Sequence, residues 1–563
     1  MNYKEMYQLW LEKADEDTKK ELLAISDEKE IEDRFYQTLE FGTGGLRGVM
    51  GAGTNRMNLY VIRWATQGIA DYINTKGAEA KQRGVVIAHD SRNHSREFAE
   101  ETAKVLAANG IHVSLFDSLR PTPMLSFAVR HLGAFAGVVV TASHNPKEYN
   151  GYKVYFEDGG QLPLHVSDMI IQYIDKVDMF SVPTTDLDNS LIELIGKEVD
   201  EAYLENVAKQ SVHPELDKTG YKLVYTPLHG SGNLPVRAIL KRTGFSDVIL
   251  VPEQVEPDGN FPTVASPNPE NKECFTRAIE LAKENQCDLI IGTDPDSDRV
   301  GIVVRSTSGE YVTMTGNQVG ALLANYILTE KKNSGQLPAN GAIVSTIVTT
   351  GILKEISKAF GVTYFDVLTG FKYIGEMIYK FETEHSHTYL LGLEESYGYL
   401  VGTYARDKDA VVASMLIAEM GVFYSKQGKT LYDVMQELYK TYGYHYEETI
   451  SITLKGKDGA EKIKALTAGL RNNPPAEFGG YKVVALDDYL TGEHTENGVK
   501  TTLTLPKSDV LRFHFENGAT FVVRPSGTEP KIKLYYLMKG KDEASTKEMF
   551  QKVKAAAEAI INS

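Results

Sequence analysis

Short apolar runs separated by longer amphipathic segments recur along most of the chain. Each run is rich in Val, Ile and Leu, does not alternate with polar residues, and enters a polar loop, as at 84–92, 136–146 and 287–299. Such runs are typical of strands in a mainly parallel sheet that helices cover on both faces. Segments such as 96–109 and 272–285 have the length and pattern of the crossover helices. The pattern therefore predicts α/β units.

The apolar strands and the loops that follow them form three pairs of similar layout: 84–92 with 136–146, 222–232 with 287–299, and 341–351 with 388–398. From about residue 445 the pattern changes to alternating segments and a hairpin over 511–536, with Asn517-Gly518 at one turn. We predict three similar α/β domains with mixed sheets plus a C-terminal α+β domain, arranged around a central cleft. The expected domain boundaries are 1–210, 211–325, 326–444 and 445–563.

Length and composition narrow the functional classes. A chain of 563 residues is long enough for about four domains. The formal charge of −16 and the pI near 5.4 argue against nucleic acid or an anionic membrane as the main partner. Residues 1–23 are expected to form an amphipathic helix, not a signal peptide. Two cysteines are too few for a disulfide framework, and no apolar run reaches the ~20 residues that span a bilayer, so we expect a soluble cytoplasmic protein.

The loop at 294–298 carries three carboxylates in five residues: Asp294, Asp296 and Asp298. At ~5 Å and an effective dielectric constant of about 20, each like-charge pair costs roughly 3 kcal/mol, so a divalent cation is the natural compensator. Oxygen ligands suit Mg²⁺ or Ca²⁺, but an EF-hand would need Gly at Arg299 and Glu at Arg305. A phosphoaspartate loop and a solvated acidic turn remain alternatives.

A second polar loop follows the apolar strand in 137–151 and contains Ser143 and His144. Chemistry in open α/β sheets lies beyond the carboxyl ends of the strands. A hydroxyl beside an imidazole is a candidate activated nucleophile. The alternative is that Ser143 caps a helix and His144 is a solvated loop residue.

Three further segments suggest anion and sugar recognition. The loop at 524–528 offers a guanidinium, two hydroxyls and a glycine, which suit a phosphate group, although a plain Pro-Ser-Gly turn is the alternative. The glycine-rich segment 41–48 carries Arg47 and matches neither a Walker A loop nor a dinucleotide fingerprint. Glu394, Glu395 and Ser396 end another strand and can bind hydroxyl groups. Together these parts suit phosphoryl transfer without a nucleotide.

The motifs in these loops resemble, in the same order, those of the α-D-phosphohexomutase superfamily over nearly the whole chain. Four loops carry the resemblance: TASHNP at 141–146 (phosphoserine loop), DPDSDR at 294–299 (metal loop), EESYG at 394–398 (sugar loop) and RPSGTEP at 524–530 (phosphate loop). FGTGGLRG at 41–48 and TGFKYIG at 369–375 are most similar to bacterial members of the phosphoglucomutase/phosphomannomutase family.

The resemblance implies an intramolecular phosphotransferase that interconverts glucose 1-phosphate and glucose 6-phosphate through a phosphoserine. Mg²⁺ and glucose 1,6-bisphosphate, as activator and intermediate, are the implied cofactors, and sugar phosphates are the implied partners. By the same resemblance, 1–210 holds the N-terminal helix and the phosphoserine, 211–325 the metal loop, 326–444 the sugar loop and 445–563 the phosphate loop.

The resemblance also implies roles for single residues. Ser143 would carry the phosphoryl group and, with Asp294, Asp296 and Asp298, hold Mg²⁺. The implied catalytic residues beside Ser143 are His144, Arg47, Lys153 and Arg299. The implied substrate-binding residues are Lys372, Glu394, Ser396, Arg524, Ser526, Gly527 and Thr528.

One departure from the family pattern affects proton transfer. Many relatives place a histidine in or soon after the sugar loop, whereas none lies between Glu394 and Asp409 here. His229 is a loose substitute that is more typical of a structural residue. A phosphomannomutase or phosphopentomutase, a metal-dependent sugar phosphatase with Ser143 as nucleophile, and a catalytically silent sugar-phosphate sensor remain alternatives.

Overall fold

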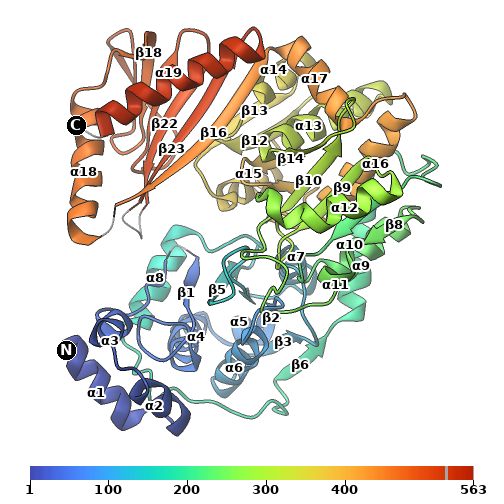
Figure 1. Cartoon of the computed structure of the whole chain (residues 1–563). Helices are drawn as coiled ribbons and strands as arrows, with labels where there is room; N and C mark the ends of the chain where they lie inside the picture. Colours follow the sequence, from blue (N-terminus) through green and yellow to red (C-terminus); the bar gives the residue numbers. More distant parts are fainter. Residues whose placement is uncertain (43, 455, 527–530, 562–563) are drawn as a thin grey trace. The chain divides into compact units, whose positions relative to one another are not determined.

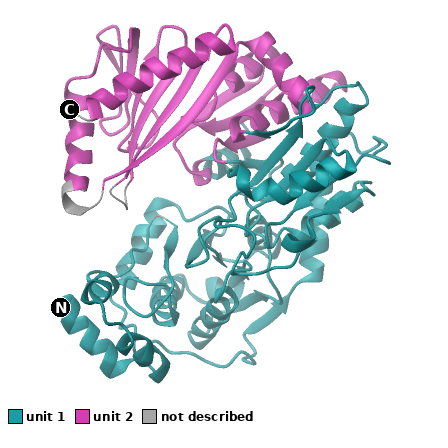
Figure 2. Ribbon diagram, in the orientation of Figure 1, with its two compact units in different colours: residues 1–314, 374–389, 397–430 teal, residues 315–373, 390–396, 431–563 magenta. Residues whose placement is uncertain are grey.

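The computed structural model describes residues 1–42, 44–454, 456–526 and 531–561. Figure 1 follows the chain from its N-terminus in blue to its C-terminus in red. The chain divides into two compact units, drawn in teal and magenta in Figure 2. Unit 1 comprises Met1–Met314, Ile374–Tyr389 and Tyr397–Thr430, and unit 2 comprises Thr315–Tyr373, Leu390–Ser396 and Leu431–Ser563.

The N-terminal segment of unit 1 forms three short helices, α1 (Tyr3–Lys13), α2 (Glu16–Leu23) and α3 (Glu28–Phe35). The prediction of one helix over 1–23 is wrong, because Asp15 accepts hydrogen bonds from two backbone N–H groups and starts a second helix there. Trp10 is fully buried, and its ring packs against those of Phe35, Tyr60 and Phe180. These aromatic contacts attach the helices to the first α/β domain.

The first sheet of unit 1 has the order β1-β5-β4-β2-β3-β6. The strands β2, β3, β4 and β6 run parallel, whereas β5 pairs antiparallel with both β4 and β1. The strands are β1 (Gly45–Val49), β2 (Val85–His89), β3 (Val113–Phe116), β4 (Ala136–Val140), β5 (Tyr149–Phe156) and β6 (Ile192–Ile195). The helices of this domain are α4 (Leu59–Asn74), α5 (Ala78–Arg83), α6 (Ser95–Ala108), α7 (Thr122–Leu132) and α8 (Leu164–Ile174).

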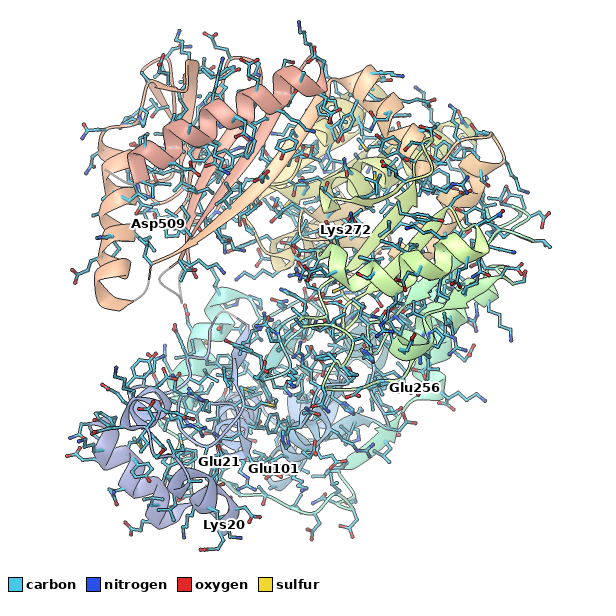
Figure 3. The ribbon with its side chains drawn as sticks, in the orientation of Figure 1. Lys20, Glu21, Glu101, Glu256, Lys272 and Asp509 are labelled. Atoms are coloured by element: carbon cyan, nitrogen blue, oxygen red, sulfur yellow. The ribbon has the colours of Figure 1, made fainter. Side chains whose placement is uncertain are left out.

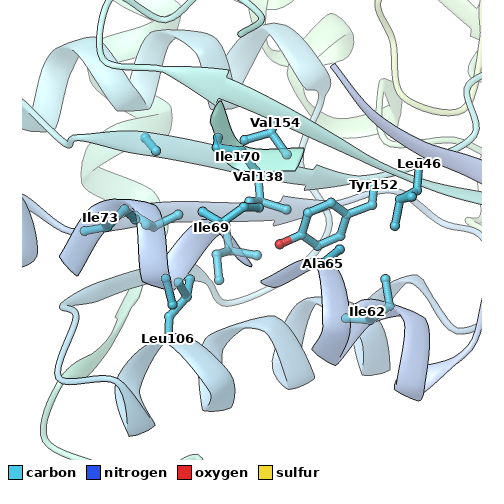
Figure 4. Packing of buried hydrophobic residues seen from close by; sticks show 14 of the residues in the cluster. Leu46, Ile62, Ala65, Ile69, Ile73, Leu106, Val138, Tyr152, Val154 and Ile170 are labelled. Atoms are coloured by element: carbon cyan, nitrogen blue, oxygen red, sulfur yellow. The ribbon is translucent and has the colours of Figure 1, made fainter. Parts of the chain in front are cut away.

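Figure 4 shows part of the core between this sheet and its helices. Val138 is inaccessible on the central strand β4, and Ile69 of α4 and Leu106 of α6 belong to the same buried cluster. Strands such as β2 and β4 are buried along their whole length, as the unbroken apolar runs predicted.

The second sheet of unit 1 has the order β11-β10-β9-β7-β8, with β7, β8 and β9 parallel and β10 and β11 antiparallel. Its strands are β7 (Leu223–Thr226), β8 (Val248–Leu250), β9 (Leu289–Thr293), β10 (Val300–Arg305) and β11 (Tyr311–Met314). The accompanying helices are α9 (Lys197–Ala208), α10 (Asn233–Arg242), α11 (Pro252–Val255), the 3-10 helix η1 (Lys272–Phe275), α12 (Thr276–Asn285) and α16 (Ala410–Ser425).

The two sheets of unit 1 repeat the same local arrangement. The strand that enters each polar loop, β4 or β9, lies between one parallel and one antiparallel neighbour. Within the loops, Ser143 and Ser297 have φ angles of 51° and 52°, in the left-handed region that non-glycine residues seldom adopt. Tyr397, after β14 (Thr388–Glu394), has a φ angle of 64°. The predicted repetition therefore extends to the backbone of the loops.

Unit 2 contains a third α/β sheet, in which β12 lies between β13 and β14. The remaining elements of this region are β12 (Gly341–Thr346), β13 (Thr363–Val367), β15 (Gly398–Leu400, in unit 1), α13 (Gly316–Asn333), α14 (Ile352–Phe360), α15 (Phe371–Glu384) and α17 (Leu431–Tyr442).

A C-terminal, mainly antiparallel sheet follows the order β16-β23-β22-β21-β18-β19-β20, with β17 beside β18. Its strands are β16 (Tyr444–Thr453), β17 (Glu477–Phe478), β18 (Tyr481–Asp488), β19 (Glu493–Glu496), β20 (Val499–Thr502), β21 (Leu511–Phe515), β22 (Thr520–Pro525) and β23 (Lys531–Gly540). Its helices are α18 (Gly456–Asn472) and α19 (Glu543–Ile561).

The third sheet and the C-terminal domain share one interface within unit 2. Ile347 and Leu368 belong to the same buried cluster as Val522 and Tyr535. The carboxylate of Asp366 pairs with Arg512 at 3.1 Å and with Lys354 at 2.9 Å.

The predicted fold class of three α/β domains and a C-terminal α+β domain is confirmed, whereas the four domain boundaries and the central cleft stay predictions. Within the described ranges, no helix is both long and apolar enough to cross a bilayer.

Gly68 tests the packing of α4 against α8. A Cβ atom on Gly68 would lie 2.2 Å from Cγ1 and 2.8 Å from N of Ile174. We expect Gly68→Ala to destabilise unit 1 by about 1–3 kcal/mol through overpacking, measured by calorimetric and urea unfolding. The control is Gly469→Ala in α18, where no atom lies within 4 Å and the new methyl group raises helix propensity by about 1 kcal/mol. Equal effects of the two substitutions would contradict the packing argument.

Candidate active site

Ser143 lies in a turn directly beyond the carboxyl end of β4. Its side chain is 3% exposed, and Oγ donates to Oδ2 of Asp294 at 2.6 Å. Nδ1 of His144 lies 3.2 Å from the same Oγ. The alternative in which Ser143 caps a helix is wrong, because residues 141–148 form turns and β5 follows them. The structure therefore joins the first polar loop to the second sheet's carboxylate loop.

Arg92 holds the backbone of the Ser143 loop in place. Its side chain is inaccessible and donates to four carbonyl oxygens, those of Ser143, Asn145, Pro146 and Tyr149. The carboxylate of Asp90 lies 3.4 Å from Nε of Arg92 and accepts from Oγ1 of Thr141 at 2.6 Å. A guanidinium group provides the several fixed donors that such a set of carbonyls needs.

The three aspartates of the 294–298 loop form a compact buried cluster. Each offers a carboxylate oxygen, and these oxygens lie within 4.8 Å of one another. Oδ1 of Asp294 accepts from the backbone N–H groups of Asp298 and Arg299 at 3.1 and 3.0 Å. Within the described part of the chain, Oδ1 of Asp296 and Oδ1 of Asp298 are buried without a hydrogen-bond partner. Buried acceptors of this kind fit a bound cation.

Two ammonium groups partly balance the aspartate cluster. Nζ of Lys153 lies 2.8 Å from Oδ2 of Asp296 and 3.4 Å from Oδ2 of Asp298. Nζ of Lys408 lies 3.3 Å from Oδ2 of Asp298. Burial and the charges of the other two aspartates raise the pKa of Asp294 well above its usual range. Burial also acts to raise the pKa of Asp296, but the Lys153 ammonium holds it below normal. A divalent cation would allow all three carboxylates to ionise.

The remaining candidate catalytic residues surround Ser143 and the aspartates. Arg47, on β1, is exposed and lies 3.3 Å from Oδ1 of Asn145. Arg299 pairs with Glu270 at 2.7 Å, and its Nε lies 3.9 Å from Oδ1 of Asp298. Burial, together with the charges of the two arginines, lowers the pKa of His144 to about 2, so its imidazole is neutral. Unit 1 thus gathers every residue that the resemblance placed around the phosphoserine.

The first three residues of the predicted sugar loop, Glu394 to Ser396, lie in unit 2. Glu394 is 6% exposed, and its Oε1 accepts from the backbone N–H of Gly370 at 2.9 Å, so this loop contacts the segment that carries Lys372. Nζ of Lys372 lies 5.0 Å from the ring centre of Tyr373. Burial and the charge of Glu394 raise the pKa of Glu395 to about 7, and Lys533 on β23 opposes this shift. Ser396 follows as a half-buried residue.

The described part of the phosphate loop begins at the end of β22. Nη1 of Arg524 lies 3.4 Å from the hydroxyl of Tyr535, and the backbone N–H of Ser526 donates to the carbonyl of Lys531 at 2.7 Å. The predicted site residues Gly527 and Thr528 lie outside the described residues.

His229 is positioned as a structural residue. Its ring nitrogens lie 3.2 Å from the carbonyl oxygen of Glu256 and 2.9 Å from Oγ1 of Thr263, and the residue is 2% exposed. Both nitrogens therefore have protein partners, and the imidazole joins two loops of the second domain.

The chain matches four models of one family, described as phosphoglucomutase/phosphomannomutase α/β/α domains I, II and III and C-terminal domain, over residues 38–180, 201–309, 315–442 and 460–556. It belongs to the phosphoglucomutase/phosphomannomutase family. The phosphoglucomutase of Staphylococcus aureus strain USA300 is 39% identical over 537 residues, which cover 94% of this chain and 95% of the relative. The phosphoglucomutase of strain MRSA252 is 39% identical over 540 residues, which cover 95% and 96%.

Solved structures share the fold of this family. A phosphoglucomutase/phosphomannomutase family protein from Burkholderia thailandensis superposes with a TM-score of 0.66 at 19% identity, covering 92% of this chain and 97% of its own. The open form of the exocytosis-sensitive phosphoprotein parafusin (phosphoglucomutase) from Paramecium has a TM-score of 0.68 at 17% identity, covering 93% and 96%. At these identities the likeness shows the fold alone.

Two residues that contact the candidate site, Arg92 and Lys408, escaped the sequence analysis. Arg92 ends a segment recognised only as a strand with its loop, although its Asp-x-Arg pattern pairs opposite charges after an apolar run. Lys408 lies in Arg406-Asp407-Lys408-Asp409, whose alternating charges directly precede the apolar helix α16. Charged residues at the end of a buried element are a usable signal, since their burial requires partners.

We expect Arg92→Lys to loosen the Ser143 loop, because an ammonium group cannot reach all four carbonyls. Unsatisfied buried carbonyls cost about 1–3 kcal/mol. Amide hydrogen exchange over 141–151 should accelerate, and the melting temperature should fall. Arg96→Lys is the matched control, since Arg96 is an exposed residue paired with Glu100 at 2.8 Å. Unchanged exchange in Arg92→Lys would show that Arg92 does not hold the loop.

Proposed function

We propose that the chain interconverts glucose 1-phosphate and glucose 6-phosphate by carrying a phosphoryl group on Ser143. The observation that carries the proposal is the 2.6 Å hydrogen bond from the Ser143 hydroxyl to Asp294, inside a buried cluster of three aspartates. The 39% identity with Staphylococcus aureus phosphoglucomutase supports glucose phosphates as substrates. The partners are therefore small sugar phosphates, and the acidic charge of −16 and two free, buried cysteines favour a cytoplasmic location.

We propose Mg²⁺ as the ion of the aspartate cluster. Ser143, Asp294, Asp296 and Asp298 would hold it, because hard oxygen ligands and unsatisfied buried carboxylate atoms suit this ion. Bound Mg²⁺ supplies positive charge to the oxygens of the transferred phosphoryl group.

The proposed reaction transfers the phosphoryl group twice. In the first transfer, the bond between phosphorus and Oγ of Ser143 breaks, a bond from phosphorus to a free sugar hydroxyl forms, and that hydroxyl loses its proton. The product is glucose 1,6-bisphosphate, which turns over. In the second transfer, the bond from its other phosphorus to the sugar oxygen breaks, a bond from that phosphorus to Oγ of Ser143 forms, and the proton of the serine hydroxyl passes to the sugar oxygen. Neutral His144, with Nδ1 3.2 Å from Oγ, and Lys153 are the candidates for moving the proton. Arg47 and Arg299 would balance the negative charge near the transferred group.

The residues of unit 2 would bind the part of the substrate that does not react. Glu394 and Ser396 suit sugar hydroxyl groups, and Lys372 lies in the segment that contacts Glu394. Arg524, Ser526, Gly527 and Thr528 would bind the second phosphate through a guanidinium, hydroxyls and backbone N–H groups.

Removing the Ser143 hydroxyl tests the central assignment. We expect Ser143→Ala to lose at least about 10³-fold in mutase activity, because it removes the hydroxyl that is proposed to carry the phosphoryl group. A coupled assay with Mg²⁺ and with glucose, mannose and ribose 1-phosphates measures both the rate and the sugar preference. The matched control is Ser181→Ala, an exposed serine bonded to Asp178.

Full activity of Ser143→Ala would exclude Ser143 as the phosphoryl carrier. Stoichiometric release of inorganic phosphate by the wild type would instead identify a sugar phosphatase. A faster reaction with mannose or ribose 1-phosphate would assign a phosphomannomutase or a phosphopentomutase.

Asp296→Asn tests the metal site. We expect Mg²⁺ affinity, measured by calorimetry, to fall by at least about 10-fold, together with activity. The control is Asp288→Asn. Asp288 precedes β9, its side chain is 40% exposed, and it forms a surface ion pair with Arg305 at 3.3 Å. Retention of both metal affinity and activity in Asp296→Asn would remove Asp296 from the metal site.

A further inference from the structure

A cavity of about 480 Å³ lies in unit 1 and is lined by none of the candidate catalytic or metal residues. Its walls are the segment 118–120 with Met124 of α7, the first turns of α9 and α10, and Glu256 with Pro257. Glu256 is labelled in Figure 3. The volume falls within the range of about 300–1,000 Å³ that small-molecule sites occupy.

Part of the cavity surface is apolar. Met124 and Leu204 are buried at 1% and 6% exposure, and Pro235 and Pro257 complete the surface beside them. Leu234 is 70% exposed and offers a large side chain to an occupant. Such walls suit an aliphatic or aromatic body.

Several charged groups of the cavity already have partners. Arg120 binds both carboxylate oxygens of Asp200, at 2.7 and 2.9 Å, and also pairs with Asp117 at 3.1 Å. Glu201 pairs with Arg242, which lies outside the cavity. Arg120, Asp200 and Glu201 are therefore already engaged in ion pairs.

The charges that remain favour an anion. Lys197 and Arg237 are exposed and form no ion pair with any residue that the structure describes, and Arg237 bonds only to the side-chain amide oxygen of Asn233, at 3.1 Å. Glu256 is the opposing carboxylate. The helices α9 and α10 begin near this cavity. Their N-cap residues, Gly196 and Gly232, provide no capping side chain, and the N-terminal ends of both helices add partial positive charge. Lys197 and Arg237 are thus the two cations of the cavity that can pair with a bound anion, and Glu256 opposes them.

Two residues at the cavity donate hydrogen bonds to the metal loop: Ser231, which lines the cavity, and Thr122, which lies between the lining residues Arg120 and Met124. Thr122 donates from its backbone N to the carbonyl of Asp296 at 2.9 Å and from Oγ1 to Oδ2 of Asp296 at 2.8 Å. Ser231 donates from N and from Oγ to the carbonyl of Pro295, both at 2.8 Å. A Cβ atom on Gly230 would lie 2.4 Å from Cα of Pro295, so no side chain fits between the wall and the loop. A displacement of the wall therefore acts directly on Asp296.

We propose that this cavity is an effector site for a small organic anion with an apolar body, and that its occupation changes the affinity of the metal loop for its cation. The coupling rests on the proposed metal site, whereas binding of the anion does not. The two affinities are reciprocal, because an effector that changes cation binding is itself affected by the cation to the same extent.

The test uses 8-anilinonaphthalene-1-sulfonate (ANS), whose apolar rings and sulfonate match the cavity. Fluorescence titration of the full chain without metal should give one saturable site. Arg237→Glu should weaken it at least about 10-fold, equivalent to about 1.4 kcal/mol, and Ala238→Trp, which fills the cavity, should do the same. The uncharged N-phenyl-1-naphthylamine should bind at least about 10-fold more weakly than ANS.

Matched controls separate this cavity from the active site. Lys241→Glu makes the same charge reversal one turn further along α10, at an exposed residue outside the cavity, and should leave ANS binding unchanged. Ser143→Ala and Arg524→Gln should also retain it. Equal ANS affinity in the wild type, Arg237→Glu and Ala238→Trp, or loss of ANS in Arg524→Gln alone, would overturn the proposal. Competition by AMP and by citrate then distinguishes a phosphate from a carboxylate as the natural anion.

A separate measurement tests the coupling between anion binding in the cavity and cation binding at the metal loop. Saturating ANS should shift the Mg²⁺ dissociation constant at least about 3-fold, and saturating Mg²⁺ should shift that of ANS by the same factor. Hydrogen exchange at 228–233 should slow when ANS binds. A bound ANS that leaves Mg²⁺ affinity unchanged would overturn the effector role, even where the mutase assay confirms Ser143.

Discussion

Three buried carboxylates beside a serine hydroxyl are the constraint on which unit 1 depends. Asp294, Asp296 and Asp298 lie in one loop at 0–2% exposure, and isolated charges at such burial would be strongly unfavourable. The surrounding structure compensates with two lysines, a threonine and backbone N–H groups. Two carboxylate oxygens still have no partner within the described ranges, and they are the atoms available to the cation that we propose for this site.

The repeated strand–loop arrangement explains how the hydroxyl and the carboxylates meet. Ser143 and Ser297 both adopt a left-handed backbone, which ordinary residues reach at some cost in energy. Arg92 holds one loop by four carbonyl oxygens, and contacts from Thr122 and Ser231 hold the other. Buried polar side chains on both sides of the site thus hold the loop backbones by hydrogen bonds. Support of this kind positions the side chains of a site.

Sequence reasoning found groups that lie together along the chain, and it missed groups that meet only in the folded domains. The aspartate loop could be predicted, since five consecutive residues contain all three carboxylates. Lys408 could not, because it reaches Asp298 only after the chain has formed a further α/β domain. The single N-terminal helix was predicted from hydrophobic periodicity, but the local competition of Asp15 for backbone N–H groups interrupts it. Domain boundaries were also uncertain, since helices such as α15 contribute to both compact units.

The separation of the site residues along the chain links activity to the folding of unit 1. Arg47 on β1, Ser143 after β4, Asp296 after β9 and Lys408 before α16 come from four separate segments of the sequence. Each contact between them closes a long loop, so its entropic cost is met only when both sheets and their helices have packed. A partly folded unit 1 would retain the aspartates without Lys153 and Lys408, and like-charge repulsion would then oppose the native loop. The carboxylate cluster is thus stable only within the complete unit. Its geometry is therefore sensitive to every segment that contacts the 294–298 loop.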